Sequence, residues 1–165
     1  MKTKKLVFNA LLLGLGLVLH QLTPAIFGVK PDMSLIMLFV IVMMNHKDYK
    51  ICLACGVLAG IFSALTTTFP GGQIPNLIDK CITVNIVYLL LILIKPLKNA
   101  YKTNIVLIVG TAVSGLIFLY SAQIIVGLPG NMNLYALYAS AVFPAIVINT
   151  IVGNIVYKAC KLIIK

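Results

Sequence analysis

The stretch NIVLIVGTAVSGLIFLYSAQIIVG, residues 104–127, is uncharged and mainly apolar. A helix needs about 20 such residues to cross the roughly 30 Å of hydrocarbon in a bilayer, so this stretch is predicted to be a transmembrane helix. Prolines, glycines and lysines separate it from five further apolar stretches. They cover residues 6–22, 33–45, 51–69, 77–94 and 134–157, and the one at 33–45 is the shortest.

The composition of the whole chain agrees with a membrane protein. Charged residues make up 10% of the 165 residues and hydrophobic residues 61%, whereas ordinary globular chains are about 25% charged. A mean hydropathy of +1.10 leaves too little polar surface to cover a soluble globule. The predicted fold class is all-α: a polytopic membrane protein whose residues 1–165 form a single transmembrane domain, a bundle of six transmembrane helices in the lipid bilayer.

The lysines predict the orientation of this bundle. All 13 basic residues are lysines, so the chain lacks the arginines that fork onto phosphates and bases, and nucleic acid is not an expected partner. Cytoplasmic loops of membrane proteins are enriched in positive charge. The side so assigned carries Lys2, Lys4, Lys5, Lys47, Lys50, Lys95, Lys98, Lys102, Lys158, Lys161 and Lys165, and the other side only Lys30 and Lys80. Both termini are therefore predicted to be cytoplasmic.

The residues of common enzyme sites are scarce. There is no glycine-rich phosphate-binding loop with its lysine, and His20 and His46 fall on opposite sides of the predicted membrane. Cys52 and Cys55 have CxxC spacing but begin an apolar helix without a second ligand pair. We therefore expect neither an enzyme nor a metal or cofactor site.

The strongest local signal is a charged pair at the outer start of the fourth predicted helix. Asn76, Asp79 and Lys80 lie at positions i, i+3 and i+4, so they share one helix face. Charges at a membrane mouth are costly unless they are paired or bound to a ligand. A zwitterionic amino acid suits this pair; the alternative is an interfacial ion pair that only anchors the helix.

A second charged pair, Lys30 and Asp32, lies on the same side and flanks Pro31. Pro31 keeps Lys30 out of helical conformation, and Asp32 can equally serve as the N-cap of the next helix. Within the predicted helix at 104–127, Tyr120 and Gln123 must face protein, water or the interface. Tyrosines here suit the wall of an aromatic site or, alternatively, an aromatic belt at the membrane surface.

Small residues on the first predicted helix mark a possible packing face. Ala10 and Gly14 lie four residues apart, a spacing that lets another helix approach closely. The partner helix is either one of this chain or one of another protein.

The residues also resemble a known family. SALTTTFPGGQIPN, residues 63–76, followed by Asp79 and Lys80, resembles the signature of Gram-positive tryptophan transport proteins. The opening MKTKKLV and the turn at residues 30–33 are similar as well. These proteins in turn resemble the six-helix substrate-binding subunits of energy-coupling factor transporters. Such subunits bind a vitamin or amino acid from outside and contact a transmembrane coupling subunit through small residues, usually Ala-xxx-Ala, where this chain has Ala10 and Gly14.

The resemblance implies uptake of tryptophan across the bacterial plasma membrane. The tryptophan would be bound at the outer face, beneath the loops at residues 25–32 and 69–76. Asp79 is expected to hold its ammonium and Lys80 its carboxylate. Asn76 and Gln73 would add hydrogen bonds, and tyrosines would flank the indole. A coupling subunit and ATPases outside this chain would supply the energy. The alternatives are a stand-alone secondary carrier, proton-coupled through Asp79, and a non-transporting membrane scaffold.

Overall fold

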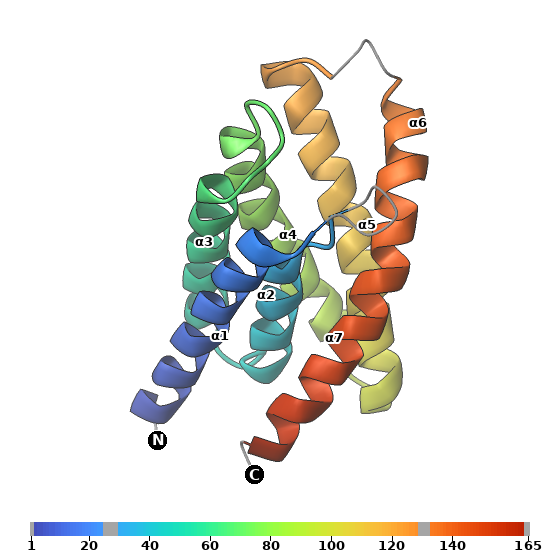
Figure 1. Cartoon of the computed structure of the whole chain (residues 1–165). Helices are drawn as coiled ribbons and strands as arrows, with labels where there is room; N and C mark the ends of the chain where they lie inside the picture. The colour runs from blue at the N-terminus through green and yellow to red at the C-terminus, as the bar shows by residue number, and fades with distance from the viewer. Residues whose placement is uncertain (1, 25–29, 129–132, 164–165) are drawn as a thin grey trace.

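The computed structural model describes residues 2–24, 30–128 and 133–163 as a bundle of helices (Figure 1). Every regular element in the described part of the chain is helical. The elements are α1 (Lys2–Leu22), α2 (Met33–Met44), α3 (Tyr49–Leu65), α4 (Gln73–Leu93), α5 (Asn99–Ile125), α6 (Leu134–Leu137), a π-helical turn (Tyr138–Val142) and α7 (Phe143–Ile163). Together they confirm an all-α helical membrane protein.

The last three elements form one continuous helix from Leu134 to Ile163, so the bundle has the six predicted helices. The wide π-helical turn was not predicted from the sequence. It ends two residues before Pro144, which has no backbone N–H and whose ring clashes with the carbonyl one turn earlier. A proline in a helix therefore favours such a local widening of the turn.

Four of the six helices are long and apolar enough to cross a membrane: Thr3–Leu22, Gln73–Leu93, Asn99–Ile125 and Leu134–Ile163. The other two are shorter. The 12 residues of α2 rise by about 18 Å and the 17 residues of α3 by about 26 Å. Neither reaches the full hydrocarbon thickness alone. The stretch at 33–45, the shortest of the six predicted, also forms the shortest of the six helices.

Helix α2 occupies the centre of the bundle (Figure 1). All ten residues from Ser34 to Met43 are buried, and the helix packs against α1, α3, α4, α5 and α7. A helix that is hydrophobic on every side is stable only when it is surrounded. The apolar sequence of α2 therefore fits a core helix shielded by protein.

Close packing between α3 and α4 depends on two glycines. Gly56 and Gly60 lie four residues apart on α3. A Cβ at Gly56 would approach Val84 Cγ1 to 2.5 Å, and one at Gly60 would approach Leu77 to 3.1 Å. Small residues at this spacing let two helix backbones approach closely in a membrane, and α3 and α4 make the most extensive contact between any two helices.

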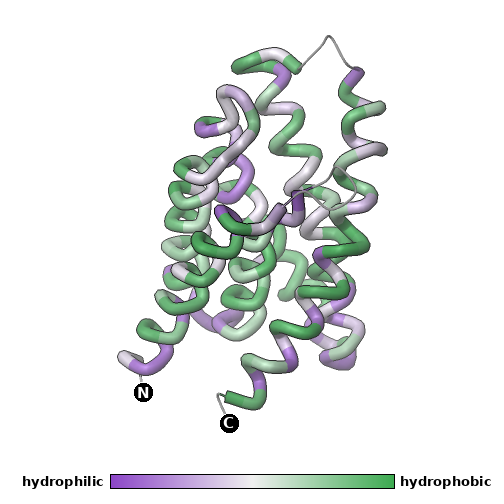
Figure 2. The backbone as a smooth tube through the Cα atoms, viewed as in Figure 1, coloured by the Kyte–Doolittle hydropathy of each residue, from purple (hydrophilic) through white to green (hydrophobic). Residues whose placement is uncertain are grey.

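The two ends of the bundle differ in their lysine content. The chain termini lie at one end, together with the α2–α3 and α4–α5 connections (Figure 1). This end shows hydrophilic patches in Figure 2, and it carries the described lysines of the lysine-rich side. Both termini are thus on the side that the positive-inside rule assigns to the cytoplasm. The opposite end holds the α3–α4 connection and the start of α4.

Candidate functional site

A cavity of about 310 Å³ opens in the half of the bundle that is remote from the termini. Its size lies at the lower end of the range for small-molecule pockets. All six helices, or the connections between them, contribute to its wall. The lining residues used below are His20, Lys30, Asp32, Phe69, Asn76, Asp79, Lys80, Thr111, Ser114, Gly115, Phe118, Val142, Ala145 and Asn149.

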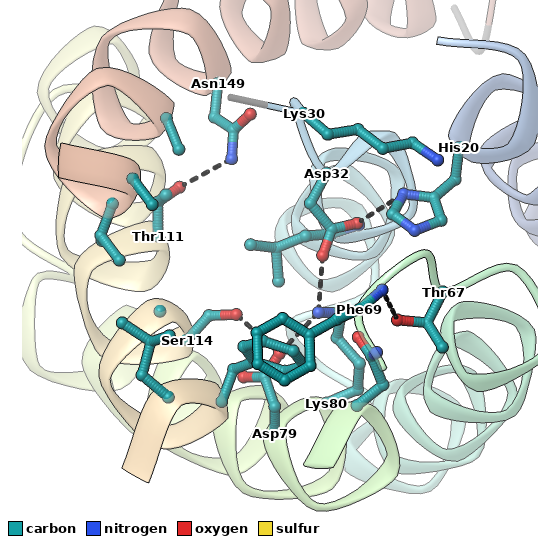
Figure 3. A pocket seen from close by; sticks show the side chains of 18 of the residues that line it. His20, Lys30, Asp32, Thr67, Phe69, Asp79, Lys80, Thr111, Ser114 and Asn149 are labelled. Carbon is teal, nitrogen blue, oxygen red and sulfur yellow. Dashed lines mark hydrogen bonds and ion pairs between the residues drawn. The ribbon is translucent and has the colours of Figure 1, made fainter. Parts of the chain in front are cut away.

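The centre of the cavity wall is a charged triad, Asp32–Lys80–Asp79 (Figure 3). The ammonium of Lys80 lies 2.6 Å from Asp79 Oδ2 and 2.7 Å from Asp32 Oδ2. Lys80 and Asp79 are each 1% exposed. Charges buried to this degree require close partners, and the triad links the start of α2 to α4.

Asp79 is also held by two hydroxyl groups. Thr83, one turn further along α4, donates to Asp79 Oδ1 at 2.8 Å, and Ser114 of α5 donates to Asp79 Oδ2 at 2.8 Å. Both carboxylate oxygens are thereby hydrogen-bonded, as a buried carboxylate requires. The position of Asp79 is fixed by groups of two different helices.

Asp32 is the more accessible acid of the triad. Its side chain is 22% exposed, and its Oδ1 accepts the backbone N–H of Leu35 at 2.9 Å, which caps α2. His20 Nδ1 lies 3.5 Å from the same oxygen. Burial acts to raise the pKa of the Asp32 carboxyl, but the charges of Lys80 and His20 and these hydrogen bonds outweigh it, so the pKa lies below its ordinary value.

The triad carries two carboxylates and one ammonium and is therefore short of one positive charge. Lys30 also lines the cavity and makes no ion pair with any described residue. Figure 3 shows Lys30 beside His20, with Asp32 below them. The site thus combines an excess negative charge at the triad with a separate free lysine, which is an arrangement complementary to a zwitterion.

Part of the cavity wall is apolar and aromatic. Phe69 and Phe118 meet edge to face with ring centroids 5.2 Å apart, a favourable geometry for aromatic pairs. Beyond them α5 and the π-helical turn approach closely, since a Cβ at Gly115 would come within 2.5 Å of Val142. Gly115, Phe118, Val142 and Ala145 form the apolar wall of the cavity.

The comparisons with known proteins agree over the whole chain. The model of the family described as tryptophan transporter TrpP matches residues 2–165. The chain belongs to this tryptophan transporter family. It is 49% identical to a probable tryptophan transport protein of Clostridium acetobutylicum, with 98% of this chain and 94% of the relative covered.

Two further relatives have the same name. The probable tryptophan transport protein of Clostridium perfringens is 42% identical, covering 94% of this chain and 90% of the relative. The probable tryptophan transport protein of Bacillus subtilis is also 42% identical, covering 100% of this chain and 95% of the relative. No solved structure matches the chain. The resemblance drawn from residues 63–80 is confirmed at the level of the family.

Five of the eight residues predicted for substrate binding line the cavity of this TrpP-family member, and three do not. Those that line it are Lys30, Asp32, Asn76, Asp79 and Lys80. The amide of Asn76 donates to the carbonyl of Gly72 at 2.8 Å, so its nitrogen is used within α4. The outer loop at residues 25–32, predicted to cover the ligand, is described only from Lys30 onward.

Gln73, Tyr120 and Gln123 do not line the cavity, and a role for them in substrate binding stays a prediction. Gln73 is the first residue of α4, beyond the cavity, and is exposed. Tyr120 is 58% exposed and Gln123 is also exposed. The cavity residues of α5 recur at helical spacing, namely Thr111, Ser114, Gly115 and Phe118. This periodicity turns Tyr120 and Gln123 to the opposite face.

Other cavity residues were not predicted. The aromatic lining consists of Phe69 and Phe118, with no tyrosine among the described residues that line the cavity. His20, Ser114 and Asn149 were not assigned to the site. A signal for two of them was present, because Ser114 and Asn149 are polar residues within otherwise apolar helices. Such residues must face protein or water.

The predicted contact residues of α1 lie on an open face. Ala10 is exposed, and a Cβ at Gly14 would meet no atom within 4 Å. Gly16, in contrast, packs against Met37 and Ser34 of α2. Ala10 and Gly14 therefore make no close helix contact within the described bundle. No group of three His, Cys, Asp or Glu side chains among the described residues is arranged to hold a metal ion.

Proposed function

We propose that this TrpP-family member takes up tryptophan across the bacterial plasma membrane and binds it from the outer face in the cavity described above. Family membership and the names of the relatives support tryptophan as the substrate. The lysine distribution supports the outer position of the cavity, which lies at the end opposite the lysine-rich one.

The missing positive charge of the triad is the observation that carries the proposal. A substrate ammonium placed between Asp32 and Asp79 supplies it, and Asp32 is exposed enough to be reached. The substrate carboxylate then pairs with Lys30, the free cation of the cavity among the described residues. Lys80, expected from the sequence to bind the carboxylate, already has two carboxylate partners. Its role in the proposal is to hold Asp32 and Asp79 in position.

The apolar wall is the place for the indole ring. It combines the Phe69–Phe118 pair with the small residues Gly115 and Ala145. Edge-to-face and stacked aromatic contacts add to simple burial of apolar area. Aromatic and apolar side chains around a few polar groups are the usual lining of a small-molecule site.

For the energy source, we propose that this chain is the substrate-binding subunit of an energy-coupling factor transporter. The support is the open face of α1 around Ala10 and Gly14, where a helix of a coupling subunit has room to approach. The ATPases would belong to other chains. In Ala10→Leu/Gly14→Leu, uptake should be lost and tryptophan affinity kept; Leu11→Ala, a neighbouring exposed position, is the control.

A stand-alone secondary carrier is the second candidate, and one observation favours it. Asp79 is a fully buried acid at the membrane level, and intramembrane acids often relay protons. Tryptophan uptake in a host without coupling ATPases, together with acidification-dependent transport by the purified protein in vesicles, would establish this candidate. Uptake that requires the ATPases would establish the subunit role.

Binding of tryptophan to the purified protein is the primary test, measured by isothermal titration calorimetry in detergent. We expect saturable binding by the wild type. Asp79→Asn should weaken it by at least the roughly 1.5–3 kcal/mol of a charged hydrogen bond, since the substrate ammonium loses a carboxylate partner. The absence of tryptophan binding by folded wild-type protein would overturn the proposed function, and an unchanged affinity of Asp79→Asn would remove Asp79 from the site.

A further inference from the structure

Oδ1 of Asn149 on α7 is a buried polar atom of the cavity that has no hydrogen-bond partner in the described structure. The residue is 1% exposed and lines the cavity. Its amide nitrogen donates to Thr111 Oγ1 of α5 at 3.4 Å, which orients the side chain. Figure 3 shows this pair on the side of the cavity away from Lys80 and Phe69. The carbonyl oxygen of the amide is thus a buried acceptor that lacks a donor.

Asn149 stands next to the apolar wall. On α7 it follows Ala145 by one turn, and on α5 its partner Thr111 precedes Gly115 by one turn. Residues four apart lie on the same helix face. Gly115 and Ala145 therefore lie on the same helix faces as Thr111 and Asn149, and all four residues line the cavity. A ring bound against Gly115 and Ala145 has one edge at the Asn149–Thr111 pair.

An acceptor in this position selects for a donor. A buried polar group without a hydrogen bond is costly, so a ligand that completes the bond is favoured over one that does not. The indole N–H is a donor only, and it lies on the five-membered ring, two bonds from the carbon that carries the amino-acid chain. A phenyl ring has no such group.

We propose that Asn149 accepts a hydrogen bond from the indole N–H through Oδ1 and so determines selectivity for indole over other aromatic side chains. This inference rests on the proposed function, since it assigns the indole to the part of the cavity lined by α5 and α7. In it, Asn149 contacts an edge of the indole and is oriented by Thr111, while the charged triad binds the amino-acid group. The amino-acid end gives affinity for any zwitterion, and Asn149 distinguishes tryptophan among aromatic amino acids.

The sharpest probe is β-(3-benzothienyl)alanine, which has a sulfur atom in place of the indole N–H and nearly the same shape. Wild-type protein should bind tryptophan about 5-fold to 150-fold more tightly than this analogue, the range that an unsatisfied buried acceptor implies. In Asn149→Leu the ratio should fall to about twofold or less, because replacing a polar partner by an apolar group of similar size removes the unsatisfied acceptor.

The matched control is Asn154→Leu, the same substitution on the same helix. Asn154 bonds to Asn104 at 2.8 Å and does not line the cavity, so its ratio should equal that of the wild type. The two ligands can be compared on wild-type protein alone, which keeps the test valid even if Asn149→Leu fails to fold. Equal affinities for the two ligands in wild-type protein would overturn the inference, as would an unchanged ratio in Asn149→Leu. In either case tryptophan would still bind and the proposed function would stand, whereas loss of all tryptophan binding by the wild type would overturn that function itself.

Discussion

The N-termini of α2 and α3 are built alike but lie in different surroundings. Asp32 caps α2 by accepting the backbone N–H of Leu35 at 2.9 Å, and Asp48 caps α3 by accepting that of Ile51 at 3.3 Å. Asp32 lines the cavity and pairs with Lys80 at 2.7 Å. Asp48 is exposed at the other end of the bundle and forms no ion pair with a described residue.

The comparison separates what a local motif does from what its location adds. An aspartate three residues before a backbone N–H is sufficient for a cap, and both residues fulfil that role. Only Asp32 meets a lysine from a distant helix and faces a cavity. With Asp79, these are the three acidic residues of the chain, so two of the three acids belong to the candidate site and one serves a helix end alone.

The largest expected difference between the two helix N-termini is in stability, and it comes from the lysine near each capping aspartate. Lys80→Met leaves Asp32 and Asp79 close together without their shared cation, and breaking a buried ion pair costs about 3–5 kcal/mol. Lys50→Met, two residues after Asp48 and exposed, should change stability by less than about 0.5 kcal/mol. The free energy of unfolding in mixed micelles measures both.

Equal stability of the two lysine variants would contradict the pairing of Lys80 with the two acids. A large loss in Lys80→Met that is reversed in the double variant with Asp32→Asn would strengthen it. The double variant has one carboxylate fewer to compensate.

The second difference concerns the charge of the two capping residues. Asparagine caps a helix as well as aspartate does, so Asp32→Asn and Asp48→Asn both keep the cap and remove the charge. Asp32→Asn should weaken tryptophan binding by about 1.5–3 kcal/mol, the value of a charged hydrogen bond, and Asp48→Asn should leave it unchanged. Titration calorimetry of the two purified variants measures this; a similar affinity in both would place the substrate ammonium away from Asp32.

The sequence predicted the helices well because their physical requirement is simple. A bilayer demands long apolar stretches whatever the contacts between them, and the six stretches correspond to the six helices. The charged part of the site was also within reach, since Asp79 and Lys80 interrupt an apolar stretch at a cost that calls for a partner. What the sequence could not show was that Lys80 is shared with Asp32, because that contact joins segments 48 residues apart.

The aromatic residues that line the cavity differ from the tyrosine expected from the sequence, for a related reason. Tyr120 and Phe118 are two residues apart on α5, so they point to different sides of the helix. Composition alone favoured the tyrosine, which has a polar tip, yet Phe118 faces the cavity and Tyr120 is exposed. The helix phase is set by packing of α5 against α4 and α7, and a uniformly apolar helix carries little pattern that reveals it.

The smallest expected effect tests the role that the two N-termini share. Asp48→Ala removes the cap of α3 and should cost about 0.5–2 kcal/mol of stability, whereas Asp48→Asn should cost almost nothing. At Asp32 the same two substitutions should not differ in this way for tryptophan binding, because both remove the charge that the substrate ammonium requires. The measurement is a pairwise comparison of unfolding free energy at residue 48 and of tryptophan affinity at residue 32. If asparagine rescued binding at residue 32 as it rescues stability at residue 48, Asp32 would act on the substrate only by capping α2, and the substrate ammonium would depend on Asp79 alone.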